Sequence, residues 1–241
     1  MMTMEQETKD INREDRSPKM NARATHLKPR KVSGFTRWIS AFVIFLAVGV
    51  GWEFLPPAID YLKYEPKDGD VVFQSLSRSP LTNTIEGATH SPYSHCGLVV
   101  EENGRWYVYE ALGNVNRTSL RSWFFRSRDR CFAAFRLDDD HQQHVPKMIE
   151  YVRKCQGLPY DMRYRMDDES IYCSELVFKA YRHATGEGLG KLVKLGDLDW
   201  KPYRAIIEQL EGGPAPTDRE MITPRDLAKA EELKLVMKTG H

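Results

Sequence analysis

The sequence has few cysteines and almost no net charge. Its 241 residues include four cysteines, with no Cys-x-x-Cys pair and no spacing to the seven histidines that is typical of a metal site. We therefore expect no zinc site, and no other metal or cofactor. The 35 basic residues are balanced by 34 acidic ones, which argues against a dedicated nucleic-acid-binding protein.

Long apolar runs are also scarce, with one exception at residues 38–52, where no charged residue occurs. Trp38 and Trp52 stand at its two ends, where membrane spans carry interfacial aromatic residues. Flanking apolar residues extend the run toward the ~20 residues that a bilayer requires. We predict a transmembrane signal-anchor helix over 35–57, ended by two prolines.

The charge around this run predicts its orientation. Residues 20–37 hold five basic residues and no acidic one, which places the N-terminus in the cytoplasm and the rest of a single-pass protein outside the cytoplasmic membrane, in the periplasm. A cleaved signal peptide with a secreted product is an alternative, although no typical cleavage site follows. A buried core helix is a third possibility. Residues 1–34 are polar and are predicted to be disordered.

From residue 64 to 241 the composition is that of a globular domain. Residues 71–73 predict a buried strand, and residues 75–92, rich in Ser, Thr and Pro, predict a surface loop. Further along, residues 131–137 predict a strand and residues 141–155 a helix. The tail predicts two helices, over 203–210 and 225–237.

A hairpin is the best-defined local structure in this domain. Residues 94–102 and 105–111 are strand-like and are separated by Asn103-Gly104. A two-residue turn pairs Leu98 with Tyr109, so His95 and Glu110 become diagonal neighbours on one face, ~7–8 Å apart or less at Cβ. A carboxylate at that distance can orient an imidazole, and Gly97 between them leaves room. Cys96 points to the opposite face and is interpreted as a packing residue.

Cys173 stands where an amphipathic helix is predicted to begin. Leu176, Val177, Ala180 and Tyr181 recur at helical spacing after it. Free backbone N–H groups at a helix start stabilise a thiolate and can hold an oxyanion. A buried, inert cysteine is the competing interpretation of this stretch alone. Together with His95 and Glu110, however, Cys173 completes a nucleophile, a base and an orienting group.

Several spaced motifs carry a family resemblance. They are Gly69-Asp70-Val71-Val72-Phe73-Gln74, the stretch Thr89 to Gly97, Tyr109-Glu110-Ala111, Gly157-Leu158-Pro159-Tyr160-Asp161 and Tyr172-Cys173-Ser174-Glu175-Leu176. In this order they resemble the YiiX-like, circularly permuted papain-fold cysteine hydrolases of the NlpC superfamily. The resemblance runs from residue 64 to about residue 224. Cys96 departs from it, because a small β-branched residue is expected at that position.

The resemblance implies an α+β fold with a six-stranded antiparallel, barrel-like sheet packed with helices. It implies Cys173 as nucleophile, His95 as base and Glu110 as the third catalytic residue, the same three residues that counting along the hairpin brings together. Tyr172 and, more weakly, Gln74 are candidates for the oxyanion or substrate site.

We therefore expect a membrane-anchored thiol hydrolase that cleaves an amide or ester bond through an acyl-enzyme. The resemblance offers two substrate classes, a lipid-like N-acyl compound and a cell-wall peptide of peptidoglycan, and no nucleic acid. Two alternatives use the same fold: a non-catalytic module that binds an acyl group or peptide, and an acyltransferase with the same three residues.

Overall fold

The computed structural model describes residues 57–240. The predicted disordered segment 1–34 and, except for its last residue, the predicted membrane helix 35–57 lie outside the described residues. Within residues 57–240, no helix combines the length and the apolar character that crossing a membrane would require.

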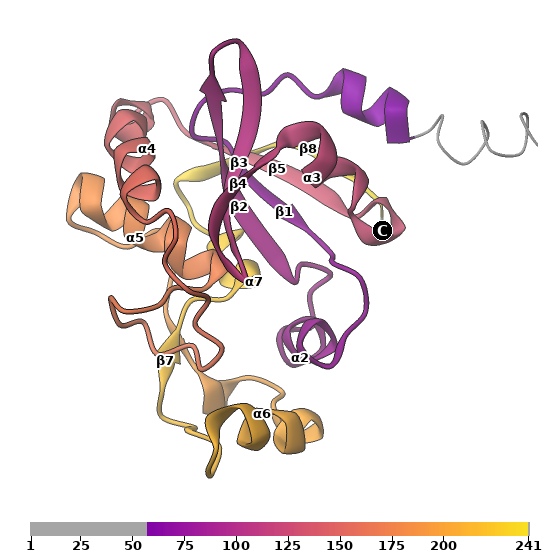
Figure 1. Ribbon diagram of the computed structural model, residues 1–241, viewed down its shortest axis with the longest axis vertical. Helices are drawn as coiled ribbons and strands as arrows, with labels where there is room; N and C mark the ends of the chain where they lie inside the picture. The colour runs from indigo at the N-terminus through magenta and orange to yellow at the C-terminus, as the bar shows by residue number, and fades with distance from the viewer. Residues whose placement is uncertain (1–56, 241) are drawn as a thin grey trace, which may run out of the picture. The chain divides into compact units, whose positions relative to one another are not determined.

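A six-stranded antiparallel sheet is the centre of the fold (Figure 1), with the strand order β4-β3-β2-β1-β5-β8. Its strands are β1 (Val71–Gln74), β2 (His95–Glu102), β3 (Arg105–Leu112), β4 (Asn114–Ser119), β5 (Phe132–Leu137) and β8 (Leu233–Thr239). No ladder joins β4 to β8 in the part of the chain that the structure describes. The α+β class with an antiparallel sheet is confirmed.

Helices and short 3-10 turns connect the strands. The α-helices are α2 (Pro80–Thr89), α3 (Leu120–Phe125), α4 (Val145–Lys154), α5 (Cys173–Thr185), α6 (Arg204–Glu211) and α7 (Pro224–Leu227). The 3-10 turns are η1 (Arg128–Arg130), η2 (Gln142–His144), η3 (Leu195–Asp197) and η4 (Lys201–Tyr203). Residues 57–63 are also helical.

The two faces of the sheet carry separate apolar cores. On one face α4 and α5 lie side by side and pack on β2 and β3, with Met148 and Leu176 fully buried between them and the sheet. On the other face α3 packs through Trp123 and Phe124 against Phe132. Alternate residues of each central strand enter the two cores, which explains why strands such as β1 are buried throughout.

The predicted hairpin is confirmed together with its register. Leu98 pairs with Tyr109 and Glu102 with Arg105. Asn103 and Gly104 both have positive φ, the conformation that a two-residue hairpin turn of this type requires. The strand predicted at 131–137 and the helices predicted at 141–155 and 203–210 are also present, as β5, α4 and α6.

The predicted loop over 75–92 is wrong, because it contains helix α2. Ser79 caps this helix by accepting from the Thr82 N–H, and Pro80 occupies its first turn. Ser and Pro are common in loops and also at helix starts, so composition favoured the loop.

The predicted helix over 225–237 is also wrong. Only the short helix α7 lies there, followed by strand β8, which pairs with β5 at the sheet edge. Leu233, Leu235 and Met237 alternate as a strand requires, but Leu227 and Ala230 before them suggested a helical stripe.

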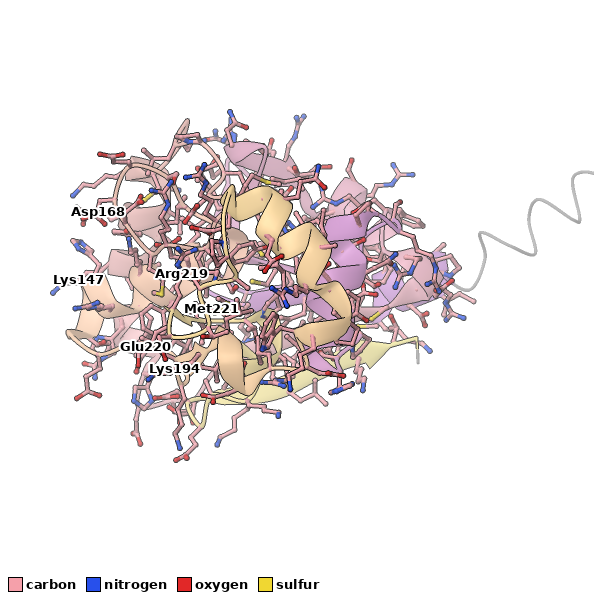
Figure 2. All side chains as sticks on the ribbon, turned by 90° about the horizontal axis from the view of Figure 1, so that it is seen from below. Lys147, Asp168, Lys194, Arg219, Glu220 and Met221 are labelled. Carbon is pink, nitrogen blue, oxygen red and sulfur yellow. The ribbon has the colours of Figure 1, made fainter. Side chains whose placement is uncertain are left out.

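A small second sheet joins two distant segments beside α6. It consists of β6 (Val193–Lys194) and β7 (Glu220–Met221), paired antiparallel. Figure 2 shows Lys194, Glu220 and Met221 together on this side of the molecule. The pairing holds the segment around Met221 next to α6, and both later line a cavity.

Candidate active site

The site begins with a buried pair on the β2–β3 hairpin. His95 Nε2 lies 2.5 Å from Glu110 Oε2, and both side chains are almost fully buried. The hairpin register brings them together, because Leu98 opposite Tyr109 sets His95 diagonal to Glu110. Gly97 makes room, since a Cβ there would lie 2.5 Å from Val108 Cγ1.

Three further donors hold the Glu110 carboxylate. Thr118 Oγ1 donates to it over 2.5 Å and Trp123 Nε1 over 3.1 Å, and Arg126 pairs with it. Burial alone would raise the pKa of Glu110, but hydrogen bonds and charge from His95 and Arg126 lower it to about 2. Glu110 is therefore ionised across the physiological range.

Glu110 fixes the orientation of the His95 ring. Because Nε2 faces Glu110, Nδ1 is the ring nitrogen that remains for another partner. The ring also stacks on Trp123, with the centroids 6.2 Å apart. Burial opposes the charged form of His95, but Cys173 and Glu110 together raise its pKa to about 9.

Cys173 is the first residue of helix α5 and is buried. The helix starts there because Glu175 accepts from the backbone N–H of Tyr172 over 3.2 Å, as in a capping box. Lys179, one turn later, lies 2.9 Å from Glu175 and holds its carboxylate. Helix α5 packs on β2, and its first residue, Cys173, contacts His95, the first residue of β2.

The pKa of Cys173 lies well below its usual value. A hydrogen bond with the Cys96 side chain is the main cause, burial opposes it, and the charge and hydrogen bond of His95 lower the pKa further. The Cys96 backbone contributes another hydrogen bond. These contacts favour a thiolate at Cys173 beside an imidazolium at His95.

The interpretation of Cys96 as a residue facing away from the site is wrong. Cys96 does point to the face opposite His95, as the strand alternation requires, but α5 packs on that same face. The thiol of Cys96 therefore contacts Cys173, and burial together with the Cys173 thiolate raises the pKa of Cys96 well above its usual value. All four cysteines are free and buried.

Two tyrosines on the loop between α4 and α5 complete the surroundings of Cys173. Their hydroxyl groups, of Tyr160 and Tyr164, lie 3.1 Å apart. Burial is the main cause that raises the pKa of both, and the Cys173 thiolate adds to it. Asp161 holds the loop by accepting from the Arg163 N–H over 2.8 Å and from the Arg165 N–H. Tyr164 has positive φ, a backbone conformation that is uncommon outside glycine.

A cleft of about 470 Å³ opens over His95. Its wall is polar near the histidine, where Ser94 and Arg126 lie, and apolar along α2, where Leu81 and Ile85 lie. His95 and Tyr160 line this cleft, whereas Cys173 is buried and does not.

The structure thus brings His95, Glu110 and Cys173 to one place. Tyr172 packs against Tyr164, with ring centroids 4.5 Å apart, and its hydroxyl accepts from the Ile222 N–H over 3.0 Å. Gln74 is paired with His95 across β1 and β2 and contacts Ser127. Neither Tyr172 nor Gln74 lines the cleft, and their roles stay predictions.

Sequence reasoning gave no role to three residues of the site: Tyr160, Tyr164 and Arg126. Tyr160 stands in one of the motifs that carry the family resemblance, but its proximity to Cys173 depends on how the loop folds back. Among residues 57–240, no three His, Cys, Asp or Glu side chains are arranged to bind one metal ion.

The chain is similar to known proteins in sequence and in fold. Residues 65–237 match the family described as permuted papain-like amidase enzyme, YaeF/YiiX, C92 family. The chain is 32% identical over 178 residues to the uncharacterized protein YiiX of Escherichia coli K12, covering 73% of this chain and 88% of that protein. A crystal structure described as metalloprotein YiiX from Escherichia coli O157:H7 superposes with a TM-score of 0.67 at 32% identity, covering 74% of this chain and all of that one.

Proposed function

Because this chain belongs to the YaeF/YiiX family of permuted papain-like amidases, we propose that it hydrolyses an amide or ester bond with Cys173 as the nucleophile. One observation carries the proposal: the buried Glu110–His95 pair lies at the end of β2 where helix α5 begins with Cys173. This arrangement supplies a thiolate, a proton carrier and an orienting carboxylate. The wider NlpC superfamily is the proposed parent group.

The reaction follows from the protonation states. The Cys173 thiolate attacks the substrate carbonyl carbon, and the free N–H groups at the start of α5 stabilise the oxyanion. The His95 imidazolium then gives its proton to the leaving amine or alcohol, and a thioester with Cys173 remains. His95, now neutral, takes a proton from water, which attacks the thioester and releases the acid and the Cys173 thiolate.

Glu110 acts through His95. Its carboxylate, ionised because its pKa is about 2, keeps Nε2 as a donor and stabilises the imidazolium. The E. coli O157:H7 relative is described as a metalloprotein. The described residues of this chain offer no set of three metal-binding side chains, so no step of the proposed reaction passes through a metal ion.

The proposed setting is the outer side of the cytoplasmic membrane, with the run at 38–52 as the anchor. Both substrate classes expected from the sequence, lipid-like N-acyl compounds and cell-wall peptides, occur there.

The pH dependence of cysteine alkylation tests the proposal. The full chain, purified in detergent, is treated with iodoacetamide between pH 5 and 10, and each cysteine is followed by peptide mapping. We expect Cys173 to be labelled fast well below pH 8, and His95→Ala to lower this reactivity because the imidazolium is lost. Cys155 is the internal reference, since it lies outside the site.

Turnover is measured on a series of N-acyl p-nitroanilides. Cys173→Ala should abolish it without lowering the unfolding temperature, and His95→Ala should reduce it at least about a thousandfold. Activity of Cys173→Ala comparable to wild type would disprove the assignment. If Cys173 is alkylated no faster than Cys155, the result favours a non-catalytic binding module. If added amines receive the acyl group in place of water during turnover, the chain is a transferase.

A further inference from the structure

An apolar cavity of about 90 Å³ lies next to the active-site cleft. Helix α2 forms one wall with residues on a single helical face, and α6 and the segment after β7 form the others. Its apolar lining residues include Leu81, Ile85, Ala88, Ile207, Leu210 and Met221. Figure 1 shows α2 and α6 on the same side of the sheet.

The cavity continues from the cleft. Leu81, Ile85 and Met162 line both of them, whereas Ala88 lines the cavity alone. Because Ala88 lies one turn beyond Ile85 on α2, the cavity extends along the helix toward its C-terminal end. Tyr164 lines the cavity and Tyr160 the cleft, and their hydroxyl groups lie 3.1 Å apart. Tyr172, the chain neighbour of Cys173, packs against Tyr164 with ring centroids 4.5 Å apart. The nucleophile therefore lies close to the junction of the two spaces.

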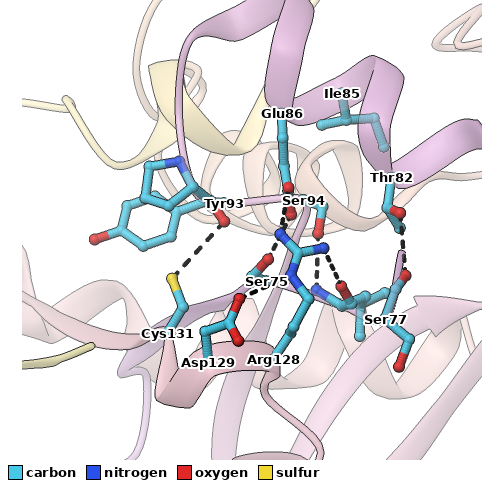
Figure 3. Close-up of polar contacts among 12 residues, drawn as sticks. Ser75, Ser77, Thr82, Ile85, Glu86, Tyr93, Ser94, Arg128, Asp129 and Cys131 are labelled. Atoms are coloured by element: carbon cyan, nitrogen blue, oxygen red, sulfur yellow. Dashed lines mark hydrogen bonds and ion pairs between the residues drawn. The ribbon is translucent and has the colours of Figure 1, made fainter. Parts of the chain in front are cut away.

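Helix α2 is anchored on its other side. Arg128 pairs with Glu86 over 2.6 Å and donates to the Leu76 carbonyl over 2.8 Å, and Ser75 Oγ donates to Glu86 over 2.5 Å (Figure 3). Gly87 allows Tyr203 to approach the helix closely, since a Cβ there would lie 1.7 Å from its hydroxyl. These contacts fix the position of α2, and therefore of the wall that it contributes to the cavity.

Three polar side chains of the cavity wall, of Thr84, Thr89 and Arg219, are already bonded within the protein, and Arg163, which also lines it, is exposed. Thr84 Oγ1 donates to the Pro80 carbonyl over 2.8 Å, and Thr89 Oγ1 to the Ile85 carbonyl over 2.6 Å. Arg219, seen in Figure 2, makes two bonds to Glu211, of 2.7 and 2.8 Å. A polar ligand would lose its hydrogen bonds to water here and gain few from the protein. A hydrocarbon group has no such bonds to lose, and its burial is favourable.

We propose that this cavity is the subsite for the hydrocarbon chain of an N-acyl substrate, with the chain lying along α2 and the carbonyl at Cys173. This inference rests on the proposed function and selects one of its two substrate classes. A peptide would place amide groups along α2, where the hydroxyls of Thr84 and Thr89 already donate to backbone carbonyls. At about 90 Å³ the cavity is smaller than the ~150 Å³ cavity that holds benzene, so it takes a short chain or the end of a longer one.

Alkyl methanethiosulfonates test the subsite without requiring turnover. The Cys173 thiolate attacks the alkyl-bearing sulfur, a mixed disulfide S–S-alkyl forms, and methanesulfinate leaves with the electron pair. The full chain in detergent is treated with reagents from methyl to octyl, and rates at Cys173 are divided by those at Cys155. We expect the ratio to rise at least about tenfold from methyl to butyl, since each buried methylene contributes up to about fourfold.

Variants of the cavity wall shift this dependence in opposite directions. Ala88→Leu shortens the cavity and should lower the rates of the hexyl and octyl reagents about tenfold, with the methyl rate unchanged. Ile207→Ala widens it from α6 and should favour the longer reagents. Ala205→Leu is the matched control, because Ala205 is exposed on the same helix and does not line the cavity.

The outcomes separate this inference from the proposed function. A flat chain-length dependence at Cys173, or equal profiles of wild type and both wall variants, would overturn the subsite. Faster turnover of peptide anilides with a terminal leucine than of hexanoyl anilide would overturn it as well. Hydrolysis of acetyl p-nitroanilide by wild type, and its loss in Cys173→Ala, reports on the proposed function alone.

Discussion

At the scale of single residues, the Glu110 carboxylate is the most tightly held group of the site. It is buried and receives bonds from His95, Thr118, Trp123 and Arg126. A buried charge is tolerated only when it is paired in this way. Its consequence for the reaction is electrostatic, because it helps to raise the pKa of His95 to about 9.

Glu110→Gln should lower the alkaline limit of activity. The thiolate–imidazolium pair of the wild type lasts as the pH rises until His95 loses its proton near pH 9. Without the carboxylate the imidazolium is less stable, so the alkaline limb of the kcat/KM profile should move down by about one pH unit, with kcat/KM about twofold lower at pH 8 and about tenfold lower at pH 10. Steady-state kinetics between pH 5 and 10 measure both.

The control for this variant is Glu102→Gln on the same hairpin. Glu102 accepts from the Tyr109 hydroxyl over 2.7 Å and does not contact His95. Glu102→Gln should therefore leave the alkaline limb of the kcat/KM profile unchanged. An unchanged limb in Glu110→Gln would show that Glu110 does not act through His95.

Cys96 is a second residue whose effect can be measured. Its thiol is the main contact that lowers the pKa of Cys173. Cys96→Val replaces the thiol with a somewhat larger apolar side chain and removes this hydrogen bond, so the pKa of Cys173 should rise. We expect alkylation of Cys173 to be about tenfold slower at pH 6 and unchanged at pH 10, where the thiol is ionised in both proteins. Cys155→Val is the matched control, and an equal effect of both would refute the role of Cys96.

At the scale of elements, the hairpin carries most of what the sequence could predict. Asn103-Gly104 fixes the turn, the turn fixes the register, and the register brings His95 to Glu110, all through local rules. The start of α5 at Cys173 could also be predicted from local sequence, because the apolar residues that follow it recur at helical spacing.

The errors concern contacts between elements or ambiguous composition. The role of Cys96 depends on which face of the sheet α5 covers, and no local pattern gives that. Strand β8 is held by β5, about a hundred residues earlier in the chain, so a partial helical stripe was misleading. The cavity wall from α2 was missed because Ser79-Pro80 was interpreted as part of a loop, although Ser followed by Pro also begins helices.

Gly97→Ala tests how closely the hairpin strands must approach. A Cβ at this position would lie 2.5 Å from Val108 Cγ1 and 2.7 Å from the Tyr109 carbonyl oxygen, so β2 and β3 must separate. Such overpacking lowers the free energy of unfolding by about 1–3 kcal/mol. Separation also lengthens the His95–Glu110 bond, so the alkaline limb of activity should fall as in Glu110→Gln. Urea unfolding and the pH profile are the measurements.

Gly113→Ala is the control for the hairpin. Gly113 has φ of +76°, but a Cβ at this position would meet no atom within 4 Å, so alanine there causes backbone strain without a clash. It should cost stability and leave the alkaline limb unchanged. A Gly97→Ala protein with wild-type stability would contradict the close approach of the two strands.

At the scale of the whole molecule, the proposed anchor and the proposed acyl subsite support each other. A hydrocarbon chain of a lipid-like substrate is delivered most directly to an enzyme held at a membrane, since such compounds partition out of water. The sequence places the apolar run within about twenty residues of the first strand of the domain, β1. Both proposals therefore call for the catalytic domain to work next to a bilayer.

Phe45→Arg tests the anchor, because Phe45 lies near the centre of the run at 38–52. A charge at the centre of a membrane span costs about 2.5–3.5 kcal/mol, so the wild-type chain should stay in the membrane after alkaline carbonate extraction and a larger share of the variant should be released. Thr36→Arg, outside the run, is the matched control and should behave as wild type.

An N-terminal epitope tag retained on the membrane-bound chain distinguishes an anchor from a cleaved signal peptide. A C-terminal alkaline phosphatase fusion should be active, because the proposed orientation exports the domain; an inactive fusion would place Cys173 on the cytoplasmic side and remove periplasmic substrates from consideration.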